Sequence, residues 1–215
     1  MRDLFGEGET TPGREPIADG GVVLRGRALP LESELLAALA RVTEAAPFRH
    51  MVTPGGFTMS VAMTNCGTAG WVTDRTGYRY DRIDPMTGLP WPAMPDSFLT
   101  LASGAAEEAG FPGFIPDACL INRYEPGARL SAHQDRNERD YRWPIVSVSL
   151  GLPAVFQFGG PARADPMRKH AVRHGDVVVW GGASRLFFHA VAPLKDGEHP
   201  VLGRTRVNLT FRRAR

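Results

Sequence analysis

Two segments in the first half of the chain place apolar residues at the spacing of an amphipathic helix. In the first, over about residues 31–46, leucines and a valine recur every three or four positions, and Pro47 follows the last turn. Two glutamates lie in its first turn, where acidic residues are favoured. The second segment, from about 96 to 109, repeats the pattern and is followed by Gly110, a typical C-terminal cap. Both are predicted to be helices with one apolar side in the core.

From Cys119 onward the pattern changes to short runs of β-branched and aromatic residues separated by glycine and proline turns. Many short strands of this kind are typical of a sandwich or barrel, and a double-sheet jelly roll is the best candidate. The predicted fold class is mostly β with flanking helices (α+β), and both helices are expected on the outer face of the jelly roll. The predicted strands are Cys119–Tyr124, Ile145–Leu150, Ala154–Phe158, Asp176–Trp180, Leu186–Ala190 and Arg206–Arg212.

The remaining segments show no long period. Residues 1–20 are rich in glycine, glutamate and proline, and are predicted to form a loose arm. Residues 48–95 interleave methionines and aromatic residues with glycine, threonine, arginine and proline, which favours short hairpins. Their apolar side chains are open to two interpretations: a satellite hydrophobic cluster under loops, or an adaptable cover for a flat, unstacked ligand.

Composition bounds the class of protein without fixing its function. With 215 residues, 43% of them hydrophobic and 22% charged, the chain is expected to be one globular domain. A net charge of +2 permits a nucleic-acid partner but does not require one. Two cysteines cannot form a disulfide framework, and no secretion signal or membrane-length apolar run is present. These features favour a reducing, cytoplasmic setting with no membrane association.

A histidine and an aspartate two positions apart are the first candidates for chemistry. If the segment around His133 and Asp135 is extended, both side chains point to the same side of the backbone. They would then supply two ligands of a 2-His-1-carboxylate iron site, which leaves coordination positions open for reaction. His189, in a later predicted strand, is the best third ligand. The other candidates, His170 and His174, precede a turn and are predicted to be exposed imidazoles without a metal role.

The last predicted strand alternates strictly between polar and apolar residues. Arg206, Asn208, Thr210 and Arg212 face one way. An outward polar face is the usual explanation for such a strand. If the polar face instead points inward together with Asn122 and Tyr124 of an earlier strand, it forms a pocket with two guanidiniums, two amides and a phenol. Such a pocket suits a small dicarboxylate, because a guanidinium grips a carboxylate through two parallel hydrogen bonds.

The motifs together resemble the AlkB family of iron(II)- and 2-oxoglutarate-dependent dioxygenases, especially its bacterial DNA-repair members. The resemblance covers about residues 45–213. It is carried by Met51–Gly56, Met59–Cys66, Trp71, Asn122–Tyr124, Pro126–Ala128, His133–Asp135, Ser147–Gly151, Gly175–Val177 and Arg206–Arg212.

The resemblance implies a single dioxygenase domain over residues 1–215. Residues of about 48–95 would form a nucleotide-recognition lid, and those of about 113–213 would form a double-stranded β-helix (jelly-roll) catalytic core.

The resemblance also implies a role for each candidate side chain. Fe(II) would be bound by His133, Asp135 and His189. The cosubstrate 2-oxoglutarate would meet Arg206 through its distal carboxylate and also contact Asn122, Tyr124, Asn208 and Arg212. The damaged base would lie between Trp71 and His133, with Tyr78, Asn137 and Arg163 near the nucleic acid.

The implied reaction is oxidative demethylation of bases such as 1-methyladenine and 3-methylcytosine. It would use Fe(II), 2-oxoglutarate and O₂ and release succinate, CO₂ and formaldehyde. The enzyme would act as a monomer on single- or double-stranded DNA, with RNA as a further candidate substrate. Two residues depart from the bacterial pattern: Phe57 stands where a tyrosine is familiar, and Asn137 where an aspartate reads the base. Both departures bear on substrate preference.

Two alternatives remain from the sequence. The same oxygenase chemistry could act on RNA or on a protein side chain. A jelly-roll module could also bind nucleic acid without turnover. The set of His133, Asp135, His189 and Arg206 argues against the second alternative, because a binding module needs none of these four side chains.

Overall fold

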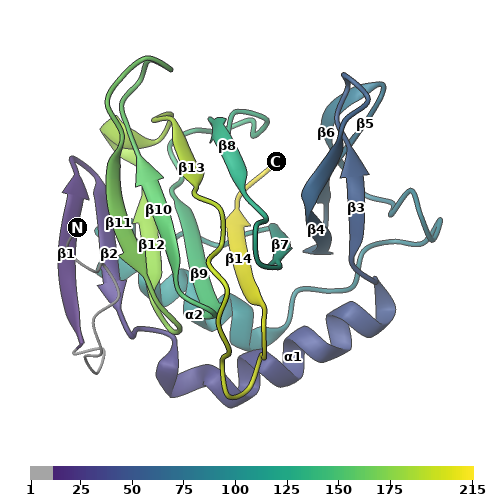
Figure 1. Ribbon diagram of the computed structural model, residues 1–215, viewed down its shortest axis with the longest axis horizontal. Coiled ribbons are helices and arrows are strands. Elements are labelled where there is room, and N and C mark those ends of the chain that lie inside the picture. The colour runs from purple at the N-terminus through teal and green to yellow at the C-terminus, as the bar shows by residue number, and fades with distance from the viewer. Residues whose placement is uncertain (1–11) are drawn as a thin grey trace.

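The computed structural model describes residues 12–215, and its core is a large antiparallel sheet of eight strands (Figure 1). Neighbouring strands are all antiparallel, and the sheet is open at both edges. The strand order is β1 (Gly13–Ala18), β2 (Gly21–Arg25), β12 (Val177–Trp180), β9 (Ile145–Gly151), β14 (Arg206–Arg212), β7 (Ala118–Tyr124), β4 (Thr58–Gly67) and β3 (Arg49–Val52).

A smaller sheet of four strands faces the large one and completes an open jelly roll, which confirms the predicted fold class (Figure 1). A separate two-stranded hairpin stands beside β3 and β4. The four-stranded order is β11 (Arg168–Val172), β10 (Ala154–Phe158), β13 (His189–Val191) and β8 (Leu130–His133), and the hairpin consists of β5 (Gly70–Asp74) and β6 (Gly77–Asp81).

Both predicted helices are present and cover the outer face of the large sheet: α1 (Glu32–Ala45) and α2 (Asp96–Glu108) (Figure 1). Their apolar sides pack against the apolar positions of the central strands, including Leu209 and Phe211 of β14. Gly110 has φ +96° and ends α2, as predicted for a C-terminal cap. Short 3-10 turns precede α1 at Leu29–Leu31 and follow β12 at Gly182–Ser184 (η2). None of the helices in the described part of the chain is long and apolar enough to cross a membrane.

A second apolar cluster lies on the inner side of the large sheet, where the two main sheets face each other. Aromatic side chains dominate it: Phe156 and Phe158 of the small sheet pack against Trp180 of the large one, with ring centroids 5.8 and 6.0 Å from the tryptophan. The cluster fills only part of the space between the sheets. Beside it, the inward-facing polar side chains of β7 and β14 line a cavity.

Most predicted strands are observed within one or two residues of their predicted ends, but Leu186–Ala190 is not. Only His189–Val191 forms a strand there, because the chain before it is still in the turn that follows η2, where Phe187 N–H donates to Ser184 O. In the part of the chain from Cys119 onward, two strands were not predicted, β8 and β11. The second of these corrects the prediction of an exposed His170. Its side chain is only 11% exposed and lies 3.7 Å from Glu15, and that of His174 is 15% exposed and lies 3.2 Å from Glu32.

The loose arm predicted for residues 1–20 is wrong from Gly13 onward, because Gly13–Ala18 forms edge strand β1. Ile17 anchors it, with 7% of its surface exposed. Its other positions are Gly13, Arg14, Glu15, Pro16 and Ala18. Charged residues and proline keep edge strands from further pairing, and the strand therefore shows no apolar alternation in the sequence. Residues 1–11 of the predicted arm lie outside the described residues.

The apolar residues of the 48–95 segment fall into a buried set and an exposed set. Met51, Met63 and Trp91 are buried in the cluster between the sheets, as a satellite hydrophobic cluster would be. Phe57 is 77% exposed and Tyr78 49% exposed, and both line the opening of a cavity. Cys66 and Cys119 are buried free thiols, as expected.

Candidate active site

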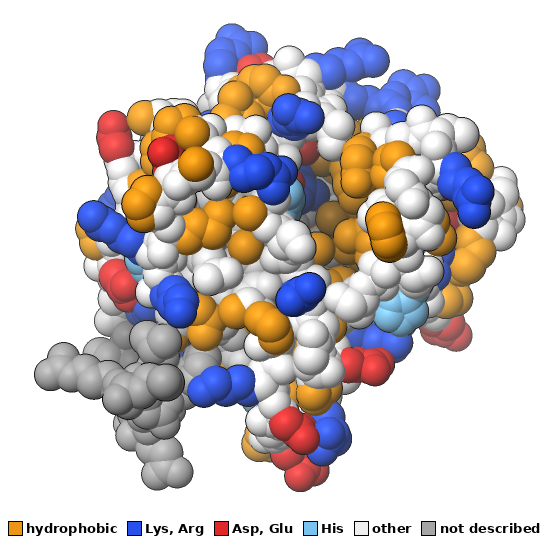
Figure 2. All heavy atoms as spheres, turned by 45° about the horizontal axis from the view of Figure 1, so that its top comes forward, with side chains coloured by type: hydrophobic (Ala, Val, Ile, Leu, Met, Phe, Trp, Pro, Cys, Tyr) orange, Lys and Arg blue, Asp and Glu red, His pale blue; other side chains and the backbone are white. Residues whose placement is uncertain are grey.

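A cavity of about 1090 Å³ opens between the two main sheets and the 48–95 segment. Figure 2 shows the hollow on this face of the molecule, with basic side chains around it. Its floor is the inner face of β7 and β14, one wall is β8 and β13, and its mouth lies beneath the β3–β4 turn and the β5–β6 hairpin. All twelve side chains proposed from the sequence line it: Trp71, Tyr78, Asn122, Tyr124, His133, Asp135, Asn137, Arg163, His189, Arg206, Asn208 and Arg212.

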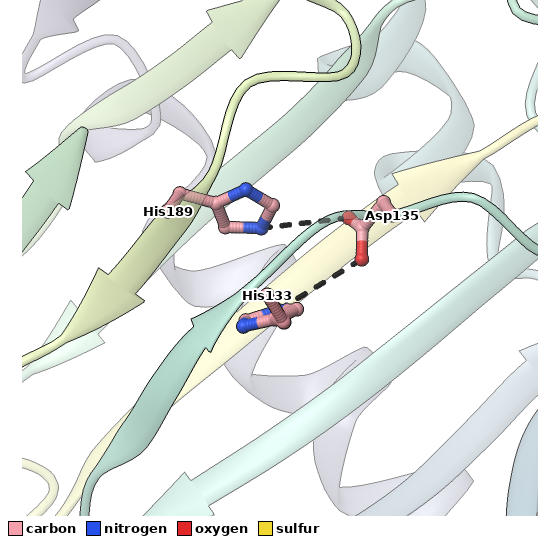
Figure 3. A group of neighbouring side chains, drawn as sticks. All are labelled: His133, Asp135 and His189. Carbon is pink, nitrogen blue, oxygen red and sulfur yellow. Dashed lines mark ion pairs between the residues drawn. The ribbon is translucent and has the colours of Figure 1, made fainter. Parts of the chain in front are cut away.

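The candidate metal ligands converge because β8 and β13 are paired. His133 and His189 are register partners in this antiparallel pair, and Asp135 follows the end of β8 and turns back toward both (Figure 3). The Nε2 atoms of His133 and His189 lie 3.9 and 3.8 Å from the carboxylate oxygens of Asp135. One ligand atom from each residue falls within 4.8 Å of the other two.

Backbone contacts orient both imidazoles for metal binding. Nδ1 of His133 lies 2.8 Å from Ser131 O, and Nδ1 of His189 lies 3.1 Å from Phe187 O. A carbonyl only accepts, so each Nδ1 carries the proton and each Nε2 keeps its lone pair toward Asp135. Hydrogen bonds of this kind are the usual supports of metal-bound histidines.

The electrostatics of the site favour the charge states that bind a metal. Burial lowers the pKa of His189 to about 3, so its imidazole is neutral at physiological pH. Burial opposes ionisation of Asp135, but the Arg212 guanidinium holds the pKa of that carboxyl well below its usual range. Two imidazoles and one carboxylate, all lining the cavity, form a donor set that suits Fe(II).

The predicted cosubstrate residues lie side by side on the cavity floor. In the β7–β14 register, Arg206 is opposite Tyr124 and Asn208 is opposite Asn122, so all four side chains share the inner face. The inward orientation of the polar positions of β14 is therefore confirmed, against the more usual outward one. The reason is that the other face of β14 packs against the helices.

Several buried polar atoms at and around Arg206 lack a hydrogen-bond partner among the described residues. The Arg206 guanidinium is buried, with 2% of the residue exposed, and donates from Nη2 to Ser149 Oγ at 2.9 Å. Its Nε and Nη1, the Tyr124 hydroxyl and Asn122 Oδ1 have no hydrogen-bond partner among the described residues. Burial lowers the pKa of Arg206 and raises that of Tyr124 to about 12. Buried polar groups are rarely left without partners, so an acid group in the cavity fits this site.

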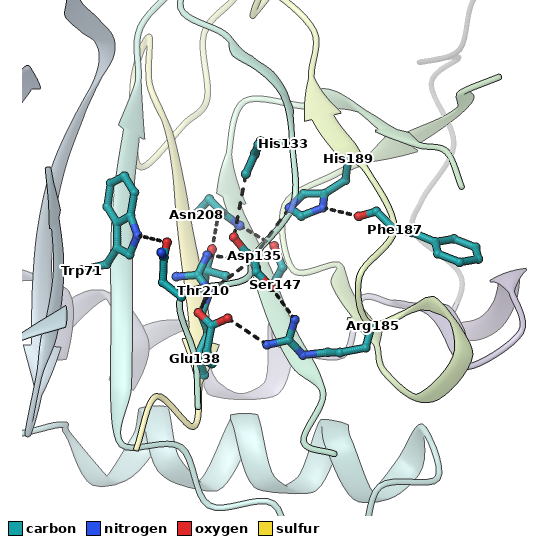
Figure 4. A network of polar contacts seen from close by, with 12 residues as sticks. Trp71, His133, Asp135, Glu138, Ser147, Arg185, Phe187, His189, Asn208 and Thr210 are labelled. Atoms are coloured by element: carbon teal, nitrogen blue, oxygen red, sulfur yellow. Dashed lines mark hydrogen bonds and ion pairs between the residues drawn. The ribbon is translucent and has the colours of Figure 1, made fainter. Parts of the chain in front are cut away.

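A buried polar network behind the metal ligands was not predicted from the sequence. Arg212 donates to Asp135 Oδ2 from Nε at 3.1 Å and from Nη2 at 2.8 Å. Arg185, just after η2, donates to the backbone oxygen of Asp135 and to Glu138, as Figure 4 shows. Tyr80 of β6 donates to the other oxygen of Glu138. No spacing rule marks Glu138 or Arg185, because each lies in a loop and meets its partners only through the fold.

The mouth of the cavity is built from aromatic and basic side chains. The rings of Trp71 and Tyr78 are stacked, with centroids 5.6 Å apart and planes inclined by 23°. The indole N–H of Trp71 donates to Asn137 Oδ1 at 3.1 Å. Arg163 donates to Ala132 O at 2.9 Å and lies over the Phe188 ring at 4.9 Å. Arg129 and Arg136 also reach the lining.

Comparison with known proteins agrees with this geometry. The sequence profile of the 2OG-Fe(II) oxygenase superfamily matches residues 22–212. The chain is 59% identical over 214 residues to the alpha-ketoglutarate-dependent dioxygenase AlkB of Escherichia coli (strain K12), covering 100% of this chain and 98% of that protein. The chain belongs to the AlkB family. It is a 2-oxoglutarate- and Fe(II)-dependent dioxygenase, and His133, Asp135 and His189 could bind the iron.

Other members of the AlkB family show how far the likeness extends. The nucleic acid dioxygenase ALKBH1 of Mus musculus is 34% identical over 132 residues, which cover 60% of this chain and 33% of that protein. The solved structure of OsALKBH1 superposes with a TM-score of 0.83 at 26% identity, covering 94% of this chain and all of the other. The jelly-roll core is therefore shared well beyond the bacterial members.

Proposed function

We propose that this AlkB-family enzyme removes N-methyl groups from damaged bases of DNA, with 1-methyladenine and 3-methylcytosine as representative substrates, and that it also accepts RNA. One observation carries the proposal: the open side of the metal site faces a cavity whose mouth is lined by stacked aromatic rings and by arginines. A flat cationic base attached to a phosphate backbone is the ligand that such a mouth suits. The nucleic acid dioxygenase name of the mouse relative supports the same class of substrate.

The floor of the cavity and its β8–β13 wall would hold the iron and the cosubstrate. His133, Asp135 and His189 would bind Fe(II), which supplies the activation of O₂ when bound. Arg206 would pair with the distal carboxylate of 2-oxoglutarate through its unpartnered Nε and Nη1. The remaining contacts to the cosubstrate would come from Asn122, Tyr124, Asn208 and Arg212.

The overall reaction balances without a further reagent. One O₂ and one 2-oxoglutarate are consumed, one oxygen atom enters succinate as CO₂ is lost, and the other enters a C–H bond of the N-methyl group. The resulting N-hydroxymethyl group then loses formaldehyde as its C–N bond breaks and the base nitrogen keeps the bonding electrons.

The mouth would hold the base itself. A methyl group on the pairing edge is shielded inside a duplex, so the base must be flipped out or already single-stranded. Trp71 on one side and His133 on the other would enclose it, and stacking on an aromatic side chain contributes about 1–3 kcal/mol. Tyr78 and Arg163 would contact the nucleic acid next to the base. Arg129 and Arg136, which also line the cavity, would meet phosphates.

We further propose that the enzyme acts as a monomer in the cytoplasm. The cavity residues of this chain supply every group assigned to the site, so a single copy would be sufficient for turnover. The two buried free thiols are typical of a reducing compartment. Size-exclusion chromatography with light scattering, on the protein with and without oligonucleotide, checks the first part of this proposal.

The proposed function is tested by measuring demethylation of oligonucleotides directly. The protein is loaded with Fe(II) and 2-oxoglutarate without oxygen, mixed with single-stranded DNA or RNA oligonucleotides carrying one methylated base, and then exposed to O₂. Mass spectrometry should show loss of one methyl group and one succinate formed per base repaired. If succinate forms only at its substrate-independent background rate and the oligonucleotides keep their methyl groups, the substrate is of another class, such as a protein side chain.

A further inference from the structure

We infer that Glu138 is a positioning residue that couples the β5–β6 hairpin, which carries Trp71, to the metal ligand Asp135. The inference rests on the proposed function only for the role of Trp71 as a stacking surface. Glu138 lies in the loop after β8, three positions beyond Asp135. Its side chain is only 2% exposed, although it is a carboxylate.

Three groups from three different elements hold the Glu138 carboxylate. The Tyr80 hydroxyl of β6 donates to Oε1 at 2.5 Å. Arg185 Nη2 donates to Oε2 at 3.0 Å, and Arg212 Nε of β14 lies 3.6 Å from Oε1. Burial, together with Glu138, raises the pKa of Tyr80 well above its ordinary value, so its hydroxyl keeps the proton that it donates.

The two arginines that hold Glu138 also hold Asp135. Arg212 donates twice to Asp135 Oδ2, and Arg185 Nη1 donates to the backbone oxygen of Asp135 at 2.8 Å. Two carboxylates therefore share two guanidiniums, and the four formal charges cancel. Removing the charge of Glu138 would leave a net positive charge beside the metal position and would release one restraint on each arginine.

The other end of the network reaches the stacking surface. In the β5–β6 register Tyr80 is the direct partner of Trp71, so the position of one determines that of the other. The indole N–H of Trp71 also donates a hydrogen bond to Asn137, the residue before Glu138. The short loop from Asp135 to Glu138 thus contacts the hairpin at two points and carries a metal ligand at its start.

A role in stability alone does not explain this arrangement well. Replacing a buried ion-pair cluster by apolar side chains of similar volume is often neutral or stabilising. A network that spans a metal ligand and a substrate surface instead fits the supports that orient metal ligands, whose loss weakens metal affinity by about 10- to 100-fold. Coupling of this kind is reciprocal, so metal binding would also favour the hairpin position that receives the base.

The test measures metal affinity in the absence of nucleic acid, with Mn²⁺ as a redox-stable probe under anaerobic conditions and calorimetry as the readout. We expect Glu138→Gln, which keeps the size and removes the charge, to weaken Mn²⁺ binding about tenfold. Tyr80→Phe removes only the hydroxyl of the hairpin residue and should weaken it about threefold. Amide hydrogen exchange should become faster in β5 and β6 in both variants.

Thr76→Ala is the matched control. It removes a hydroxyl that donates to Asp74 within the β5–β6 turn, so it loosens the hairpin without touching Glu138. Its hydrogen exchange should rise in the hairpin while its Mn²⁺ affinity stays at the wild-type value. A folded Glu138→Gln or Tyr80→Phe protein with wild-type Mn²⁺ affinity would overturn the inference, as would equal loss of affinity in Thr76→Ala.

Tyr80→Phe keeps the test decisive if Glu138→Gln fails to fold, because it leaves all four charges in place. The outcome is also separate from the proposed function, since no substrate is present in the titration. A wild-type protein that leaves methylated oligonucleotides untouched would contradict the proposed substrate while the Mn²⁺ result could still stand.

Discussion

The floor and the mouth of the cavity are built in different ways. The floor residues sit on paired strands, and Asn122, Arg206, Asn208 and Arg212 are all at most 5% exposed. The mouth residues sit on turns, loops and a two-stranded hairpin, and Phe57, Tyr78 and Asn137 are exposed. The floor is therefore organised before any ligand arrives, whereas the mouth can adjust to the shape of the substrate. We expect the floor to determine the chemistry and the mouth to determine the choice of base.

Two measurements separate the two regions. Oxidation of 2-oxoglutarate in the absence of nucleic acid, measured as the amount of succinate formed, reports on the floor alone. The kcat/KM for a methylated oligonucleotide reports on both. At saturating Fe(II), where a weaker metal affinity has no effect, a substitution in the floor should change both quantities, and one in the mouth should change only the second.

The largest effect is expected at the metal ligands. His133→Ala, Asp135→Ala or His189→Ala should abolish both succinate formation and demethylation, because a three-ligand site has no spare ligand. Near-wild-type turnover by any of the three under saturating iron would remove that residue from the ligand set. Asp135→Ala should also destabilise the metal-free fold by about 3–5 kcal/mol, because it leaves Arg212 buried without its main partner. Urea unfolding of the three variants, compared with Asp135→Asn, checks this difference.

A smaller but still large effect is expected at Arg206. Removing one partner of a buried charge pair costs about 2–5 kcal/mol, so the KM for 2-oxoglutarate in Arg206→Ala should rise by at least about thirtyfold. Arg206→Lys should recover only part of this, because an ammonium cannot make the two parallel hydrogen bonds. Circular dichroism melts show whether the variants are folded. An unchanged KM for 2-oxoglutarate in folded Arg206→Ala would contradict the assignment.

The same contrast explains what the sequence predicts. The floor is encoded in alternation: Arg206, Asn208 and Arg212 point to one side because strand side chains alternate, and register brings Asn122 and Tyr124 beside them. The His133 and Asp135 pair follows the same rule. Alternation alone did not determine which face of β14 points inward, because an isolated strand usually turns its polar face to solvent.

Contacts that depend on loop geometry were not predictable. Glu138 and Arg185 are 47 residues apart and lie in loops, so no periodicity relates them. Strand β1 was missed because an edge strand with a single buried apolar residue has almost no sequence signal. Likewise, nothing in the sequence indicates that the amide of Asn137 is engaged by Trp71.

In the mouth, the largest effect is expected at Trp71. Loss of base stacking in Trp71→Ala should lower kcat/KM for a methylated oligonucleotide by about 5- to 150-fold, the equivalent of about 1–3 kcal/mol. Trp71→Phe keeps a ring for stacking but loses the indole donor to Asn137, so it should lose much less. Substrate-independent succinate formation should stay near the wild-type rate in both variants. A parallel fall in both assays would show that the mouth and the floor are not separable at this residue.

The smallest effect, and the most specific one, is expected at Asn137. The indole N–H of Trp71 can only donate, so it orients the amide oxygen of Asn137 toward itself and leaves the amide N–H groups free.

In Asn137→Asp one carboxylate oxygen can keep that bond while the other accepts from the exocyclic amine of the base and offsets its positive charge. Hydrogen bonds to charged groups contribute about 1.5–3 kcal/mol, against about 0.5–1.5 kcal/mol for neutral ones. We therefore expect kcat/KM for 1-methyladenine and 3-methylcytosine to rise about tenfold. Neutral 1-methylguanine, which has a carbonyl oxygen at C6 where 1-methyladenine has its amine, should gain little. Both lesions belong in the same single-stranded oligonucleotide at one salt concentration, because phosphate contacts weaken as salt rises. Equal changes for cationic and neutral lesions would show that Asn137 does not face the base.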